Sequence, residues 1–431
     1  MFPTDSTNCW NIDGEVEQSA EKLTLIAANS RATTTTAYED FILELECKTT
    51  EGALGGIYFH SQGFQSLKYG YEVLINNNRE ANDWRKTGSL AAVRNFGKCL
   101  VGNEEWFPIR IEVRGMNIRV YVGDYHVVDY HQPKTPYRLP EYNKRRLSEG
   151  VFVFVNRSDY PISFRNLQIK VLEKGPGNTT QALDEQNDEL IRYHQMNFPL
   201  IDTHLHLCDS LTVENVEDMS RKYGITYGIA PGCGLESGLL NNEQAEDWLK
   251  KTENRIFFTP LQIESVSWKE LFSSATIQQF DYIVSDALAG LSLRSIQLPR
   301  GKRYLTEEEQ MDELVAYMSH VIQTESADIY ANPTLLPEEM RSRAKTLWTT
   351  ERMERLIDAC VSSNTAIEIN TYFQLPSQDF IRLAKDKGAK FALGTNNHTL
   401  TDIDQLAYAL SVIRSCGLTA EDMYIPITTE K

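Results

Sequence analysis

The feature that most constrains the fold is a change of hydrophobic periodicity partway along the chain. In residues 41–47 and 109–113 apolar side chains alternate with polar ones, the pattern of strands with one buried face. Farther along, short apolar segments alternate with stretches of helical periodicity, which is typical of parallel βα units. A chain of 431 residues is also too long for one ordinary core. We therefore expect an all-β sandwich over residues 1–172, a linker and lead-in helix over 173–197, and an α/β domain over 198–431.

The charge balance argues against several classes of partner. With 43 basic and 60 acidic residues the formal net charge is −17, which disfavours nucleic acid and anionic membranes, because both need clustered Lys and Arg. No apolar run reaches the roughly 20 residues of a membrane-spanning helix. Residues 1–6 lack the features of a signal peptide, so the sequence as given predicts a cytoplasmic protein, or a periplasmic or secreted one if a leader has been removed. The seven cysteines form no CxxC pair and predict reduced thiols.

Within the first domain, residues 58–86 interleave aromatic and polar side chains. A concave sheet face of this composition suits sugars, whose rings stack on aromatic faces while their hydroxyls take hydrogen bonds. The candidate substrate-binding residues are His60, Tyr71, Glu72, Asn76, Trp84 and Lys86. The alternative is that the tyrosines belong to the sandwich core and the polar groups to a solvated rim.

The order of several segments in this domain resembles a known family. Residues 40–45, 55–60, 70–75 and 86–90, followed by a final segment at 164–167, resemble the 3-keto-disaccharide hydrolase family. The resemblance implies a concanavalin-like jelly roll and activity on 3-keto-glycosides. The chain departs from the family where Leu-Gly-Gly-Ile stands at 54–57 and where His60 replaces a common arginine.

In the second domain, polar side chains follow the ends of the expected strands. His204 and His206 lie two residues apart in an apolar segment, so in a strand they project to the same side. A strand end can also carry two histidines without any chemical role. The other strand ends supply Gln262, Glu264, Asp286, Asn332, Asn396 and His398. Because the C-terminal ends of parallel strands share one rim, we expect these groups to converge there, where histidine and carboxylate ligands favour Zn, Mn or Fe.

This domain resembles the PHP (polymerase and histidinol phosphatase) family of metal-dependent hydrolases. The matching segments are 202–206, 281–286, 367–370 and 394–398, together with Glu264. The resemblance implies a distorted seven-stranded (β/α) barrel in which Glu264, Asp286 and His398 are catalytic and Asn370 binds substrate. The metal ligands it implies are His204, His206, Glu264, Asp286, Asn332, Asn396 and His398. Asn396 stands where the family has a metal-binding aspartate and Asn332 where it has a histidine, so one or two divalent ions are expected rather than three.

Three functions are compatible with these features. The first is hydrolysis of an ester or phosphoester by metal-activated water, with a carbohydrate or sugar phosphate as substrate and the sandwich directing it. The second places the enzyme in the sandwich, which cleaves 3-keto-glycosides while a catalytically weakened barrel serves as scaffold. The third is a non-enzymatic glycan-binding protein. The basic segment at 300–303 either meets an anionic substrate or forms an ordinary solvated loop.

Overall fold

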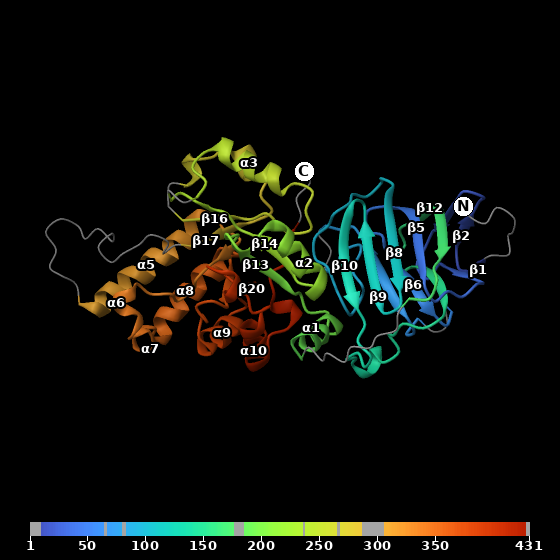
Figure 1. Cartoon of the computed structure of the whole chain (residues 1–431). Coiled ribbons are helices and arrows are strands. Elements are labelled where there is room, and N and C mark those ends of the chain that lie inside the picture. Colours follow the sequence, from blue (N-terminus) through green and yellow to red (C-terminus); the bar gives the residue numbers. More distant parts are fainter. Residues whose placement is uncertain are drawn as a thin grey trace. The chain divides into compact units, whose positions relative to one another are not determined.

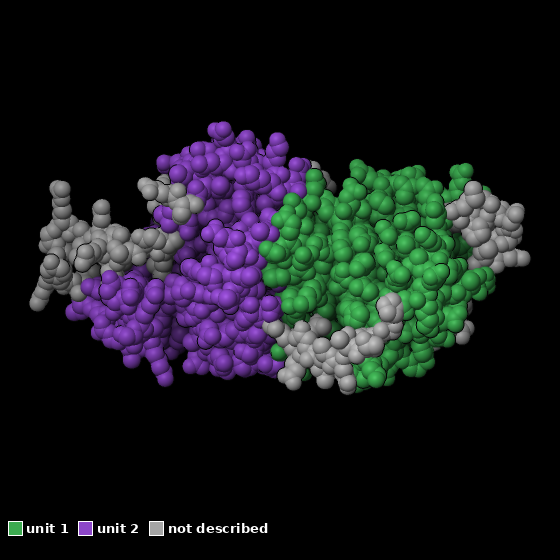
Figure 2. All heavy atoms as spheres, in the orientation of Figure 1, with its two compact units in different colours: residues 1–200, 214–226, 254–256 green, residues 201–213, 227–253, 257–431 purple. Residues whose placement is uncertain are grey.

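The computed structural model describes residues 10–63, 67–79, 83–175, 185–235, 238–264, 268–286 and 306–427. Its contacts divide the chain into two compact units, which Figure 2 colours separately. Unit 1 contains residues 1–200, 214–226 and 254–256, and unit 2 contains residues 201–213, 227–253 and 257–431. The basic segment at 300–303 lies outside the described residues.

Unit 1 is built on a sandwich of two antiparallel sheets (Figure 1), as the alternating pattern predicts. One sheet has five strands, in the order β1 (Trp10–Asp13), β4 (Arg31–Thr34), β11 (Val151–Asn156), β6 (Leu54–Ser61) and β7 (Tyr71–Asn76). The other has seven, in the order β10 (Tyr125–His131), β9 (Asn117–Val122), β8 (Phe107–Arg114), β5 (Phe41–Thr49), β12 (Ile162–Val171), β3 (Lys22–Leu25) and β2 (Val16–Gln18).

The side chains that form the core of the sandwich are those that the two-residue period of the strands turns inward. Phe41, Leu43 and Leu45 on β5 are buried and alternate with more exposed residues. On β11 the core-facing residues are Phe152 and Phe154, both fully buried. The alternate residues of the five-stranded sheet form a second, smaller cluster on its opposite face, around Tyr58, Val153 and Val155.

Unit 2 is organised around a parallel sheet. Its strand order is β14 (Thr226–Ile229), β13 (Ile201–Leu205), β20 (Phe391–Gly394), β19 (Ala366–Asn370), β18 (Ile329–Tyr330), β17 (Ile283–Ser285), β16 (Leu261–Ile263) and β15 (Gly232–Cys233). The two ends of this order, β14 and β15, are consecutive on the chain. Between them the Ala230 amide donates to the Leu205 carbonyl, while the Gln262 amide donates to the Pro231 carbonyl. The sheet thus curls until both ends reach one stretch of chain, which is compatible with the expected α/β barrel.

Helices precede, connect and follow these strands along the chain. They are α1 (Glu185–Gln195), α2 (Val213–Tyr223), α3 (Asn242–Thr252), α4 (Ser274–Ile277), α5 (Glu307–Glu325), α6 (Glu338–Arg341), α7 (Ala344–Leu347), α8 (Thr350–Ser362), α9 (Gln378–Asp386) and α10 (Ala407–Cys416). Helices α5, α8, α9 and α10 pack side by side in that order (Figure 1). Helix α10 ends at Gly417, whose left-handed φ of 65° is the expected glycine stop.

Two further expectations can be compared with the described part of the chain. Within it, no helix combines the length and the apolar character needed to cross a membrane. Its six cysteines, at positions 47, 99, 208, 233, 360 and 416, are free thiols, as the absence of a CxxC pair predicts.

Candidate functional site in the parallel sheet

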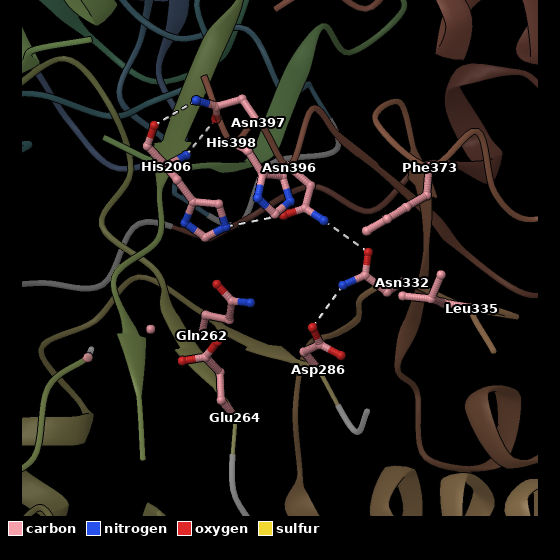
Figure 3. Close-up of a pocket in the computed structure, with 12 residues that line it drawn as sticks. His206, Gln262, Glu264, Asp286, Asn332, Leu335, Phe373, Asn396, Asn397 and His398 are labelled. Carbon is pink, nitrogen blue, oxygen red and sulfur yellow. Dashed lines mark hydrogen bonds between the residues drawn. The ribbon is translucent and has the colours of Figure 1, made fainter. Parts of the chain in front are cut away.

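A cavity of about 440 Å³ lies where the strand ends of unit 2 converge (Figure 3). Its described lining residues are His206, Gly232, Gly238, Gln262, Glu264, Asp286, Asn332, Leu335, Phe373, Asn396, Asn397 and His398. Figure 3 shows His206 and Asn396 across the cavity from Gln262, Glu264 and Asp286. The structure therefore brings together six of the seven residues predicted as metal ligands, and only His204 is absent from the described wall.

His204 is fully buried beside the cavity and is held by Glu368. The His204 ring lies 4.8 Å from the His206 ring, centroid to centroid, and its Nδ1 is 2.6 Å from Glu368 Oε1. Burial alone would lower the pKa of His204, but the Glu368 carboxylate outweighs it and raises that pKa. A hydrogen bond with the Gln262 side chain also raises the pKa of His204. A carboxylate that fixes Nδ1–H is the usual support of a metal-binding histidine, because Nε2 can then bind a metal in place of its proton.

Two amides, Asn332 and Asn396, connect Asp286 to His206, and a third, Asn370, helps to fix their orientation. The Asp286 carboxylate accepts from Asn332 Nδ2 at 2.8 Å, so Asn332 turns its Oδ1 away from Asp286. That oxygen accepts from Asn370 Nδ2 at 2.8 Å and from Asn396 Nδ2 at 2.9 Å. The amide of Asn396 consequently presents its Oδ1 to His206 Nε2, at 3.2 Å.

His206 cannot satisfy both of its neighbours as a neutral ring. Its Nδ1 lies 2.9 Å from the Ala230 carbonyl oxygen and its Nε2 faces Asn396 Oδ1, so both ring nitrogens meet acceptors. Burial and, next, the nearby His204 lower the pKa of His206 to about 4, which leaves one N–H at neutral pH. With that N–H donated to Ala230, the Nε2 and Oδ1 lone pairs face each other. A bound cation, or a ligand hydroxyl, would relieve this arrangement.

The donor set fits at most one cation. Among the described residues no group of three or more His, Cys, Asp or Glu side chains is placed to hold a metal ion. What remains is His206 Nε2 beside Asn396 Oδ1, together with Nε2 of the neighbouring His204 ring. Two ligands of one ion stand about 3 Å apart, given metal–nitrogen bonds of ~2.1 Å. The 3.2 Å between His206 Nε2 and Asn396 Oδ1 meets that requirement.

The remaining predicted residues of this unit have different environments. Burial and then Asp286 raise the pKa of Glu264, so this carboxyl is suited to take up a proton. The His398 side chain is exposed and stacks on Tyr372, with 4.4 Å between ring centroids. Asn370 Oδ1 accepts from the Phe373 amide and Asn370 Nδ2 donates to Asn332 and Glu368, so this side chain positions its neighbours.

Candidate residues in the sandwich

The six sugar-binding candidates of the sandwich are buried, so the prediction that they line an open face was wrong. His60 is 1% exposed, its Nε2 lies 2.8 Å from the Glu39 carbonyl oxygen, and its Nδ1 accepts from the Ser148 amide. The Tyr71 hydroxyl donates to Gln132 at 2.5 Å. The polar groups of both side chains are therefore hydrogen-bonded inside the fold.

Three more candidates support neighbouring backbone. Asn76 Nδ2 donates to the Arg85 carbonyl at 2.6 Å, and Trp84 Nε1 donates to the Asn197 carbonyl at 3.1 Å. The Lys86 ammonium donates to the carbonyls of Asn78 and Asp83. These contacts explain why polar groups are tolerated at buried positions, since each has a partner.

Glu72 differs from the other five because it belongs to a charged cluster. It forms ion pairs with Arg157 and with Arg145, the latter at 3.5 Å. Arg157 also donates to the Tyr58 hydroxyl at 3.2 Å, and the Arg145 guanidinium stands 5.4 Å from the centroid of the Tyr58 ring. Arg145 Nε and Nη1 have no hydrogen-bond partner although the residue is only 8% exposed. Sequence reasoning missed both arginines, since a basic residue in a loop gives no local signal.

Comparison with known proteins extends the description of unit 1. Residues 1–170 match a family model described as 3-keto-alpha-glucoside-1,2-lyase-like domain. This confirms the resemblance of the N-terminal domain to the 3-keto-disaccharide hydrolases and supports a carbohydrate-directed function for it. The match ends before the parallel sheet begins, so the PHP resemblance of unit 2 stays a prediction. No curated protein matches the chain significantly.

Two solved structures are similar to part of the chain. A protein from Parabacteroides distasonis, described as a glycosyl hydrolase, is 15% identical, with a TM-score of 0.35, and the alignment covers 40% of this chain and 92% of that one. The carbohydrate-binding module CBM66 from Bacillus subtilis is 17% identical, with a TM-score of 0.29, over 38% of this chain and 95% of the module.

Proposed function

We propose that the sandwich cleaves 3-keto-glycosides by elimination. The match of residues 1–170 to a 3-keto-α-glucoside-1,2-lyase-like domain carries this proposal. The cluster around Glu72 supports it, because it combines a carboxylate, a phenol and an arginine with unpartnered N–H groups. These are the groups that proton abstraction next to a carbonyl requires.

The chemistry follows from the substrate. A 3-keto group acidifies the hydrogen on C2, so Glu72 takes that proton and the electron pair forms the C1–C2 double bond. The C1–O bond breaks, and the departing oxygen receives a proton from the Tyr58 hydroxyl. The N–H groups of Arg145 hold the keto oxygen as negative charge builds on it. A proton passing from Glu72 to Tyr58 restores the starting state, and no water is consumed.

The test is Glu72→Gln in the full-length protein. We expect turnover of a 3-keto-disaccharide to fall by about 10²- to 10⁴-fold, because general-base assistance is lost. Formation of the unsaturated product is measured by ultraviolet absorbance, and thermal unfolding checks that the variant folds. Tyr58→Phe should also slow turnover, whereas Glu44→Gln, an exposed carboxylate on β5, should leave it unchanged. Full activity in Glu72→Gln together with loss in His204→Ala would place the enzyme in the barrel instead.

A second candidate function is hydrolysis in the cavity of unit 2. The observation that favours it is the pair of facing acceptors, His206 Nε2 and Asn396 Oδ1, beside the ring of His204. These three groups would hold one divalent ion, and N,N,O ligands suit Zn, Mn or Fe. Such an ion supplies a water of pKa ~7 and polarises an ester oxygen. Glu264, with its raised pKa, would accept the proton of that water.

Metal content tests this second candidate. After loading with Zn²⁺, Mn²⁺ or Fe²⁺ and dialysis, we expect about one ion per chain by elemental analysis. His204→Ala should lose that ion, and His320→Ala, an exposed histidine on α5, should keep it. At 100 times the dissociation constant the ion should stabilise the wild type by about 2.7 kcal/mol. Protein that takes up no ion under any of these conditions would rule the candidate out.

A further inference from the structure

We infer that the cavity of unit 2 binds an uncharged saccharide. The inference rests on the carbohydrate-directed function proposed above and names the substrate class of this second site. Of the two substrates expected from the sequence, a carbohydrate or a sugar phosphate, it selects the first. The observations that carry it are an aromatic rim, the facing acceptors His206 Nε2 and Asn396 Oδ1 in the wall, and the size of the cavity.

The rim consists of three aromatic rings in mutual contact. The ring centroids of Tyr372 and His398 lie 4.4 Å apart, those of Tyr372 and Phe373 4.9 Å, and those of Phe373 and His398 6.3 Å. Phe373 and His398 line the cavity, and Tyr372 is 40% exposed. Such exposed ring faces are suited to stack against the apolar C–H face of a pyranose.

Backbone contacts hold this rim in place. The Phe373 amide donates to Asn370 Oδ1 at 2.8 Å, and the Tyr372 amide donates to the Thr395 carbonyl at 3.2 Å. The rings are thus fixed to the ends of β19 and β20, beside the amides that line the cavity. A fixed platform costs less conformational entropy on binding than mobile side chains do.

The wall offers acceptors that a sugar hydroxyl can satisfy. His206 Nε2 faces Asn396 Oδ1, and Gln262 lies in the same wall with its side chain hydrogen-bonded to His204. A sugar hydroxyl carries one O–H, which it can donate to one of the two facing acceptors. A phosphate dianion brings mainly acceptors and would meet the carboxylates of Glu264 and Asp286. Among the described lining residues none is Lys or Arg.

The size of the cavity agrees with this ligand. At about 440 Å³ it falls in the range of ~300–1,000 Å³ that is typical of small-molecule sites. It can hold one or two sugar units with part of the ligand outside, against Tyr372. The polar lining then forms hydrogen bonds with the ligand, and the aromatic rim stacks against it.

The test compares sugars of different charge on the full-length protein. Glucose, galactose, mannose, trehalose and maltose are titrated by saturation-transfer NMR and calorimetry, in parallel with glucose 6-phosphate and glucuronate. The titrations are repeated in Glu72→Gln, so that turnover in the sandwich cannot affect them. We expect at least one neutral sugar to bind and the two anions to bind at least tenfold more weakly.

Rim variants assign that binding to the cavity. Tyr372→Ala and Phe373→Ala should each weaken binding of the neutral sugar by at least fivefold, in the wild type and in Glu72→Gln alike. Tyr160→Ala, which removes a 52% exposed tyrosine from the sandwich, should leave it unchanged. The inference is overturned if no neutral sugar binds, if an anion binds more tightly, or if folded Tyr372→Ala binds as well as wild type. None of these results depends on the lyase activity of the sandwich.

Discussion

Glu368→Ala is expected to destabilise the protein by about 3–5 kcal/mol, the cost of leaving one member of a buried charged pair alone. Glu368 is fully buried, and its two oxygens face three nitrogens: His204 Nδ1, the Asn332 amide and Asn370 Nδ2, at 2.6, 2.8 and 2.9 Å. Gly394 packs against the carboxyl. Urea unfolding followed by tryptophan fluorescence measures the loss. Glu351→Ala removes an exposed carboxylate on α8 and should change stability by less than about 0.5 kcal/mol.

Because Glu368 and His204 both titrate, the stability lost in Glu368→Ala should depend on pH. The pKa of Glu368 is lowered in the folded protein, since His204 and its hydrogen bonds outweigh burial, so its contribution is present above the unfolded pKa of ~4.3 and disappears on acidification. The pKa of His204 is raised, so its contribution is present below the unfolded value of ~6.5 and disappears as pH rises through the folded one. The difference between wild type and Glu368→Ala should therefore be greatest at pH ~5–6. An equal difference from pH 4 to pH 9 would contradict a charged pair.

The parts that the sequence predicts well are those that local pattern determines. The strands at 41–49 and 107–114 are found from alternation, because a sheet with one buried face imposes a period of two. The convergence of His206, Glu264 and Asp286 follows from topology, because parallel strands end at one edge of their sheet. Neither inference requires knowledge of contacts between residues that are distant in the sequence.

Other parts depend on partners that lie far away in the sequence. Interleaved aromatic and polar residues look alike whether they face a sugar or a buried network, and only contacts such as Tyr71 with Gln132 decide between the two. Glu368 holds His204 across 164 positions of sequence. Helix α10 begins at Ala407, directly after Leu406, whose left-handed φ of 65° interrupts any helix on its N-terminal side.

Asn396→Asp is expected to raise the affinity for Zn²⁺ or Mn²⁺ by at least about tenfold. Asn396 is 5% exposed and its Oδ1 lies 3.2 Å from His206 Nε2, so an aspartate places a full negative charge beside that nitrogen with almost no change of shape. At a separation of 4 Å and an effective dielectric constant of 20, one unit charge pair is worth about 4 kcal/mol, so tenfold is a conservative expectation. Calorimetric titration against a competing chelator measures the change.

The substitution should also make the fold depend on the ion. Asn396 Nδ2 donates to Asn332 Oδ1 at 2.9 Å, and an aspartate would replace that hydrogen bond by two facing oxygens. We therefore expect the metal-free variant to unfold at a lower temperature than wild type and the loaded variant to recover. Asn364→Asp adds the same charge at an exposed position and should alter neither property. If Asn396→Asp binds metal no better than Asn364→Asp, the facing acceptors of His206 and Asn396 are not a cation site.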